Sequence, residues 1–188
     1  MKTATILTLS AFALTLSACS KKDDADAPAT TAAEADAMAS DPSSAVPAAS
    51  AGQTFADTAA ASDAFEIETS RLAADKAQSA RIKSFAAGMI KAHTDSTAKL
   101  AGAAAKANPP ITPAATLNAT QQATLDTLRS RSGADFDTAY AKAQVDAHQM
   151  TLDALKAYAA SGDVPSLKTF AGEMVPVVTG HLNMAKGL

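Results

Sequence analysis

Apolar and polar residues follow one another along most of this chain with the period of an α-helix. From Thr54 onward, apolar side chains recur every three or four residues, which places them on one face of a helix. This spacing continues for several turns at a time and is broken only at short polar or proline-containing stretches. The pattern predicts four long helices and one short helix, over residues 55–77, 79–106, 118–131, 134–160 and 165–186.

Residues that disfavour helix interiors mark the ends of these segments. The stretch NPPITP, residues 108–113, stops the second helix because proline lacks a backbone N–H and clashes with the preceding turn. Ser132 and Gly133 end the short helix, and Pro165 suits the first turn of the last helix. Pro176 falls inside that last helix and is expected to kink it.

An internal repeat groups the long helices in pairs. The segment IKSFAAGMI, residues 82–90, matches LKTFAGEMV, residues 167–175, and each copy follows a helix and a short turn. Two related helical hairpins are therefore predicted, joined by a long connection that contains the short helix. Such a connection allows a crossover along the bundle, as in ferritin-like topology, although an up-down-up-down order would tolerate it too. The predicted fold class is all-α: a four-helix bundle over residues 54–188, for which a ferritin-like crossover is one of the two topologies left open.

The N-terminus has the pattern of an export sequence. Lys2 precedes an uncharged apolar run that is too short to span a bilayer comfortably. The run ends in LSAC, which resembles the lipobox of bacterial lipoproteins and implies that residues 1–18 are a signal peptide and that Cys19 is lipidated. Ser20 follows rather than aspartate, and under the sorting rule for such lipoproteins this favours the outer membrane, facing the periplasm. The expected partner is therefore the membrane, through the lipid anchor.

The segment after the cysteine has a different composition from the helical region. Residues 19–53 are rich in Ala, Ser, Asp and Pro and contain almost no large apolar side chain. Such a segment cannot bury enough surface to offset the entropy lost on ordering. It is expected to be a flexible, disordered tether between the lipid and the domain.

Composition and charge narrow the classes of protein further. Apolar residues make up 47% of the chain but aromatic residues only 4%, and alanine dominates, which suits closely packed helices better than a sheet. The net charge of −3 disfavours a nucleic-acid-binding protein, which would carry a surplus of basic residues. Cys19 is the only cysteine, so its acylation would leave no thiol for a disulfide or for a metal ion.

The candidate chemistry lies in three histidines and one glutamate on the apolar faces of the long helices. His93, His148 and His181 fall on the second, third and fourth long helices, and Glu66 falls on the first. A helix rises about 1.5 Å per residue. Counted from the hairpin turns, these four residues lie at similar heights along the bundle axis, within roughly two helical turns of one another. His181 is expected to deviate most from the common height. They would form either a transition-metal site or a metal-free polar layer. Residues expected to support this cluster are Glu68, Asp137 and Tyr140. A simpler interpretation of Tyr140 is that its ring is buried and its hydroxyl is hydrogen-bonded, with no role in the cluster.

The spacing around the histidines disfavours a ferritin-type di-iron centre. Such centres use Glu-x-x-His on two helices, because the glutamate bridges the two metals. The residues three positions before the histidines are Ile90, Val145 and Val178, none of which binds a metal. If a metal ion is bound, its identity is therefore left open.

Several segments in order resemble one bacterial family. EIETSRLAADKA, IKSFAAGMIKAHT, FDTAYAKAQVDAH and VPVVTGHLNMA are similar to segments of the secreted family of unknown function numbered 4142, whose members are often described as outer-membrane proteins or lipoproteins. The resemblance implies a ferritin-like four-helix bundle and supplies no reaction. One departure is Ala92, where the family usually has an aspartate before the histidine. The positions that match recurring polar residues of the family are Glu66, His93, Asp137, Tyr140, His148, Pro176 and His181.

Together these features predict an envelope lipoprotein without an assigned reaction. The first hypothesis is a non-enzymatic binding or structural module that faces the periplasm, acting with envelope protein partners. The alternative is a metal-binding or redox bundle that uses the inward histidines and Glu66. Neither hypothesis identifies the protein as an enzyme.

Overall fold

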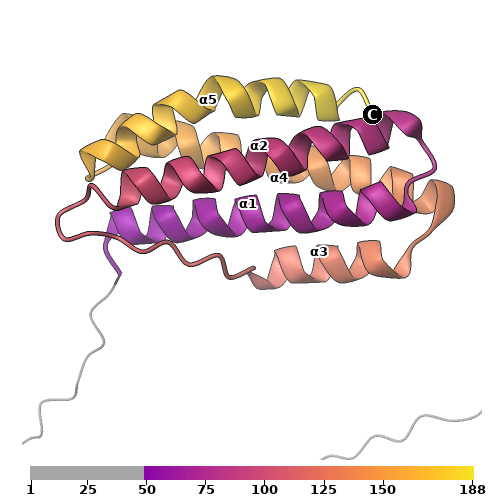
Figure 1. The fold of residues 1–188 in the computed structure, drawn as a ribbon, viewed down its shortest axis with the longest axis horizontal. Coiled ribbons are helices and arrows are strands. Elements are labelled where there is room, and N and C mark those ends of the chain that lie inside the picture. The colour runs from indigo at the N-terminus through magenta and orange to yellow at the C-terminus, as the bar shows by residue number, and fades with distance from the viewer. Residues whose placement is uncertain (1–48) are drawn as a thin grey trace, which may run out of the picture. The chain divides into compact units, whose positions relative to one another are not determined.

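The computed structural model describes residues 49–188. The predicted signal peptide, Cys19 and most of the predicted tether lie outside these residues. All regular elements among residues 49–188 are helices, and none of these helices is both long and apolar enough to cross a membrane. The helices, labelled in Figure 1, are α1 (Ala51–Lys76), α2 (Ala80–Ala104), α3 (Ala119–Ser130), α4 (Gly133–Ser161) and α5 (Pro165–Ala185).

The helix ends agree closely with the sequence-based prediction, except at the start of α1. This helix begins at Ala51, four residues before the predicted position, because Ser50 caps it: the Ser50 hydroxyl accepts a hydrogen bond from the backbone N–H of Gln53 at 3.1 Å. The last residues of the predicted tether are thus helical. Pro176 lies inside α5, which continues past it as one helix.

Contacts at the two ends of the bundle fix the directions of the helices. At one end, the Asp137 carboxylate near the start of α4 accepts hydrogen bonds from the backbone N–H groups of Gln78 and Ser79 in the α1–α2 turn, at 3.1 and 2.9 Å. At the other end, the Ser166 hydroxyl at the start of α5 donates to the carbonyl of Ala103 near the end of α2. Helices α2 and α4 therefore run in the same direction, and the chain between them crosses the length of the bundle (Figure 1).

Helix α3 forms part of this crossover and lies against α1 and α4. Its start has a capping box, in which the Asn118 side chain accepts from the Gln121 N–H and the Gln121 side chain accepts from the Asn118 N–H, both at 2.9 Å. Only Leu125 and Leu128 of this helix are buried. The helix therefore covers the edge of the bundle and adds little to its centre.

Two apolar clusters occupy the two ends of the bundle, and polar side chains lie between them. One cluster is built around Phe55, which stacks on Tyr158 with ring centroids 3.9 Å apart. The other is built around Phe136 and Tyr140, both fully buried. The buried polar side chains between these clusters form what we call the polar layer: Ser62, Asp63, Glu66, Thr69, Ser70, His93, Ser96, Gln144 and His148.

Candidate metal centre

Three imidazole rings meet inside the bundle at the polar layer. His93 comes from α2, His148 from α4 and His181 from α5. One ring nitrogen of each lies within 4.8 Å of the corresponding nitrogens of the other two, and each pair of ring centroids is 5.6 Å apart. His93 and His148 are buried and His181 is half-buried. The predicted cluster of histidines is thus present, and His181 is not the outlier that the residue count indicated.

Hydrogen bonds on the outer edges of two rings decide which nitrogen faces inward. The Nδ1 atom of His93 lies 2.8 Å from Oδ1 of Asp63, and Nδ1 of His148 lies 2.8 Å from the backbone carbonyl of Gln144. A carbonyl and a carboxylate can only accept, so each Nδ1 carries a proton, and in the neutral form of each ring Nε2 presents a lone pair. The nitrogens without a hydrogen-bond partner are His93 Nε2, His148 Nε2 and His181 Nδ1.

The three histidines could hold a metal ion. Lone pairs that converge in a buried site repel one another unless a donor or a cation lies between them. Nitrogens that share a zinc ion at 2.0–2.1 Å are about 3.4 Å apart in a tetrahedron, so the rings need to approach by no more than about 1.4 Å. The hydrogen bond from the far side of a ring to a carboxylate or carbonyl is also the usual support for a histidine that binds metal.

Burial and neighbouring charges shift the pKa values of the three rings in different directions. Burial, followed by the nearby charge of His93, lowers the pKa of His181 to about 4. Burial also lowers the pKa of His148 to about 4, although its bond to the Gln144 carbonyl opposes this. Burial alone would lower the pKa of His93 too, but the hydrogen bond to Asp63 and the charge of Glu66 outweigh it and raise that pKa. His148 and His181 are therefore neutral near pH 7, which is the form that binds a metal.

Glu66 lies beside the histidine cluster without belonging to it. Its Oε1 atom is 3.6 Å from Nδ1 of His148, which is the outer edge of that ring. Only 1% of the residue is exposed, and neither carboxylate oxygen has a hydrogen-bond partner. Burial raises the pKa of Glu66 to about 7, with the charge of His93 opposing the shift.

The three residues expected to support the cluster lie elsewhere. Glu68 points to the surface, where its carboxylate is 3.5 Å from Arg129. Asp137 ties α4 to the α1–α2 turn, as described above. Tyr140 is fully buried and its hydroxyl is 3.0 Å from the Ser70 hydroxyl, as the simpler interpretation predicted. Burial raises the pKa of Tyr140, so its hydroxyl stays protonated.

Asp63 is the one residue of the cluster that sequence reasoning missed. It is 5% exposed and holds His93 through Oδ1, while its Oδ2 lies 3.3 Å from the Thr97 hydroxyl. It precedes Glu66 by three residues, so the two carboxylates share a helix face, and that spacing could have revealed it. Asp63 thus supplies a carboxylate to His93 from α1.

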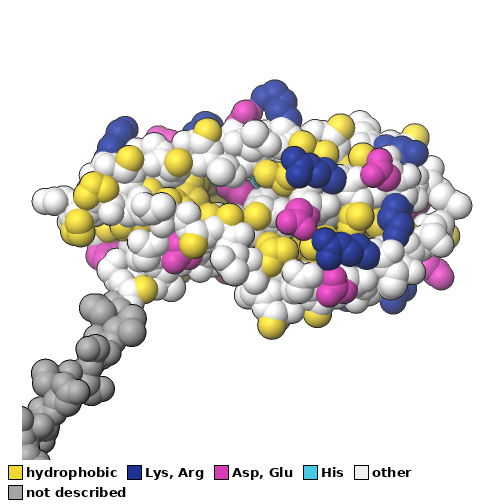
Figure 2. Space-filling model, turned by 60° about the horizontal axis from the view of Figure 1, so that its bottom comes forward, with side chains coloured by type: hydrophobic (Ala, Val, Ile, Leu, Met, Phe, Trp, Pro, Cys, Tyr) yellow, Lys and Arg dark blue, Asp and Glu magenta, His cyan; other side chains and the backbone are white. Residues whose placement is uncertain are grey.

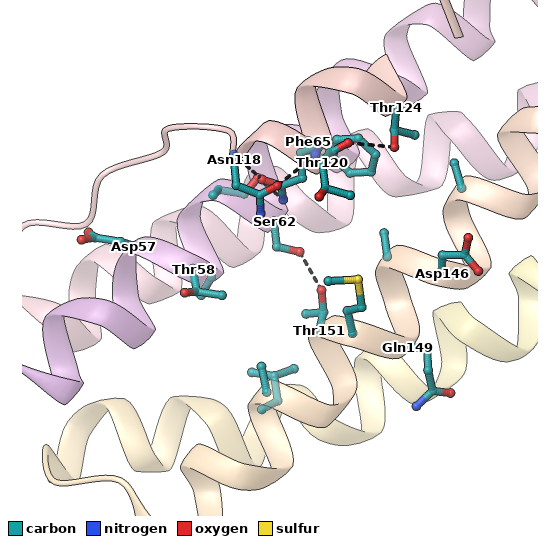
Figure 3. A pocket seen from close by; sticks show the side chains of 18 of the residues that line it. Asp57, Thr58, Ser62, Phe65, Asn118, Thr120, Thr124, Asp146, Gln149 and Thr151 are labelled. Carbon is teal, nitrogen blue, oxygen red and sulfur yellow. Dashed lines mark hydrogen bonds between the residues drawn. The ribbon is translucent and has the colours of Figure 1, made fainter. Parts of the chain in front are cut away.

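A separate groove lies between α1, α4 and the start of α3. It has a volume of about 800 Å³, and its floor is crossed by a hydrogen bond of 2.7 Å between the hydroxyls of Ser62 and Thr151 (Figure 3). Phe65, Met150 and Leu155 are among the apolar side chains that line it, and its lining contains no histidine, lysine or arginine. The groove is therefore distinct from the histidine cluster. The face that Figure 2 brings forward carries acidic and basic side chains close to one another.

Comparison with known proteins relates the fold to a copper protein of known structure. CopM in its Cu(II)-bound form superimposes with a TM-score of 0.60 at 15% identity, covering 72% of this chain and 93% of that chain. CopM in its Cu(I)-bound form gives a TM-score of 0.59 at 14% identity over the same shares of the two chains. These identities show a common fold. No curated protein matches the sequence.

The family is established by a match that covers nearly the whole chain. The match runs from residue 17 to residue 188, so it includes all five helices and the residues of the histidine cluster. The family to which this chain belongs is the one described as a domain of unknown function, DUF4142.

Proposed function

We propose that this domain binds a single transition-metal ion, copper in the first instance, through His93, His148 and His181. The observation that carries the proposal is the convergence of three imidazoles whose inward nitrogens lack any hydrogen-bond partner. Imidazole suits copper, zinc, iron and nickel. Copper is preferred because the protein of the same fold, CopM, was solved in Cu(II)-bound and Cu(I)-bound forms.

The residues around the histidines would prepare them for the ion. Asp63 and the carbonyl of Gln144 hold two rings with their lone pairs inward before any ion arrives, so little ordering is left for the binding step. The apolar clusters on both sides fix the helices that carry the rings. The bound ion would supply Lewis acidity and, in the case of copper, one-electron redox chemistry.

The arrangement of helices also supports a more specific fold assignment. Two antiparallel hairpins joined by a crossover, with α2 and α4 parallel, are what a ferritin-like bundle requires. We assign the domain to that class by topology, without a di-iron centre, because the glutamates of the Glu-x-x-His pattern are missing from the chain.

Attachment to the outer membrane remains part of the proposal. It rests on the apolar N-terminal run, the LSAC sequence and Ser20. The domain would then face the periplasm on its tether. Fractionation of cells that express the full chain tests this: recovery of the mature protein in the soluble periplasmic fraction would contradict lipid anchoring.

The metal content of the natively exported protein tests the main proposal. The domain purified from its own compartment is expected to bind one copper ion per chain in a titration followed by elemental analysis. Chelation of the ion should lower the thermal midpoint, because an ion that binds only the folded state stabilises it. A copper content well below one per chain after titration would instead support the first sequence-based hypothesis, a structural or binding module without metal.

Replacing Asp63 by asparagine is expected to weaken metal binding by about ten- to a hundredfold, as is usual for residues that orient a ligand. Asparagine keeps the size of the side chain, but its NH₂ group can face Nδ1 of His93, and it lacks the negative charge that offsets the ion. The measurement is the copper affinity in competition with a chelator. Asp137→Asn, at the end of the bundle, is the matched control and should leave the affinity unchanged.

A further inference from the structure

The carboxylate of Glu66 receives no hydrogen bond of normal length from the residues around it. Both oxygens are buried without a hydrogen-bond partner. The Thr69 hydroxyl donates to the backbone carbonyl of Phe65 at 2.9 Å, and one N–H of the Gln144 amide donates to the Thr69 hydroxyl at 3.2 Å. A buried carboxylate without donors is costly unless a cation approaches it. A cation in contact with this carboxylate would therefore stabilise it.

We propose that Glu66 is the oxygen ligand that completes the site for Cu(II), and that it does not bind Cu(I). This inference rests on the proposed function, since it assumes that copper occupies the histidine cluster. It assigns Glu66 a role that separates the two oxidation states of the ion. The consequence is that the protein's preference between Cu(II) and Cu(I) is set by one side chain of α1.

The position of Glu66 makes it available for this role. Its Oε1 atom is 3.6 Å from Nδ1 of His148, and the two nitrogens of one imidazole are about 2.2 Å apart by ring geometry. Oε1 therefore lies within about 5.8 Å of the inward Nε2, and three side-chain torsions allow the carboxylate to swing towards an ion held there. Helix α1 is also the one long helix without a histidine, so each of the four would contribute one ligand.

The other nearby carboxylate is not free to take this role. Oδ1 of Asp63 is 2.8 Å from Nδ1 of His93, and Oδ2 is 3.3 Å from the Thr97 hydroxyl. To reach the ion, Asp63 would have to release the ring that it orients. Glu66 has no such bond to give up, so it is the carboxylate that can move.

The chemistry of copper gives the two oxidation states different needs. Cu(II) favours tetragonal sites with four nitrogen and oxygen ligands, whereas Cu(I) is softer and is satisfied by three nitrogens. A dication in a buried site also gains more from a second carboxylate than a monocation does, because the attraction scales with the charge. Three histidines therefore suffice for Cu(I), and Glu66 adds what Cu(II) needs.

Glu66→Gln is the variant that tests this inference, because glutamine keeps the shape and removes the charge. The affinity for Cu(II), measured by chelator competition, is expected to fall at least about tenfold, while the affinity for Cu(I), measured the same way without oxygen, stays within about threefold. Glu68→Gln on the same helix is the matched control, since the Glu68 side chain is 43% exposed and lies near Arg129, away from the histidines. It should change neither affinity.

A measurement on the unmodified protein makes the test independent of how the variant folds. The infrared carboxylate stretching bands should shift when Cu(II) binds and should not shift when Cu(I) binds. The inference would be overturned if Glu66→Gln weakened the binding of Cu(II) and Cu(I) equally, or weakened neither. It would also be overturned if the infrared carboxylate bands did not shift when Cu(II) binds. Failure of the proposed function looks different, because then the unmodified protein binds neither form of copper.

Discussion

Replacing His148 by alanine is expected to lower the copper affinity by at least about a hundredfold. The substitution removes one of three nitrogen ligands, and the two that remain come from different hairpins and cannot hold the ion alone. His148 also packs beside both other imidazoles, at 5.6 Å between ring centroids, and beside Phe85 at 6.4 Å. The measurement is the stoichiometry and affinity of copper binding by chelator competition.

The effect of His148→Ala on the metal-free fold is expected to be smaller. A cavity is created, which destabilises the domain, but the lone pair of a buried nitrogen without a partner is removed, which offsets part of that cost. Ser96→Ala is the control, because Ser96 is buried on the same helix face as His93 and is not a ligand candidate. Full copper binding by His148→Ala would place the ion elsewhere in the protein.

Replacing Phe136 by alanine is expected to lower the free energy of unfolding by about 3–5 kcal/mol. Phe136 is 0% exposed, stacks on Tyr140 with ring centroids 6.0 Å apart, and lies beneath the ammonium of Lys76 at 5.7 Å. Alanine would leave a cavity at the end of the bundle where α4 meets the α1–α2 turn, and the helices there can close it only in part. Urea unfolding followed by circular dichroism measures the loss.

Two further substitutions separate lost packing from other effects at this position. Phe136→Leu keeps most of the volume and should cost less than about 1.5–2 kcal/mol. Met150→Ala, at a residue that is 65% exposed, should stay within about 0.5 kcal/mol of the unmodified protein. A loss below 1 kcal/mol in Phe136→Ala would mean that this end of the bundle is packed loosely, contrary to the burial of its side chains.

The helices could be predicted from the sequence because each one encodes its own boundaries. Prolines, the Ser132–Gly133 pair and the 3.6-residue spacing act over a few residues, so no tertiary information is required. The start of α1 was missed because a single serine cap, Ser50, extends the helix into a segment whose composition indicates a tether. The direction of the crossover needed the structure, since its length suits both topologies.

The candidate site was predictable to the level of residues on a helix face, and no further. His93, His148 and His181 were found because histidines are rare in this chain and all fall on apolar stripes. Asp63 and Glu68 show the limit: they lie five residues apart on α1, yet one holds a ring of the cluster and the other reaches Arg129 at the surface. Their roles depend on the rotation of α1 against its neighbours, which packing decides.

The histidine cluster joins two halves of the chain whose only covalent link is the connection from α2 to α4. His93 belongs to the first hairpin, and His148 and His181 belong to the second. The chain has one cysteine, so it cannot form a disulfide within itself. An ion bound by these residues would act as a removable cross-link between the hairpins, and the mechanical coupling of the two halves would then depend on the supply of metal around the protein.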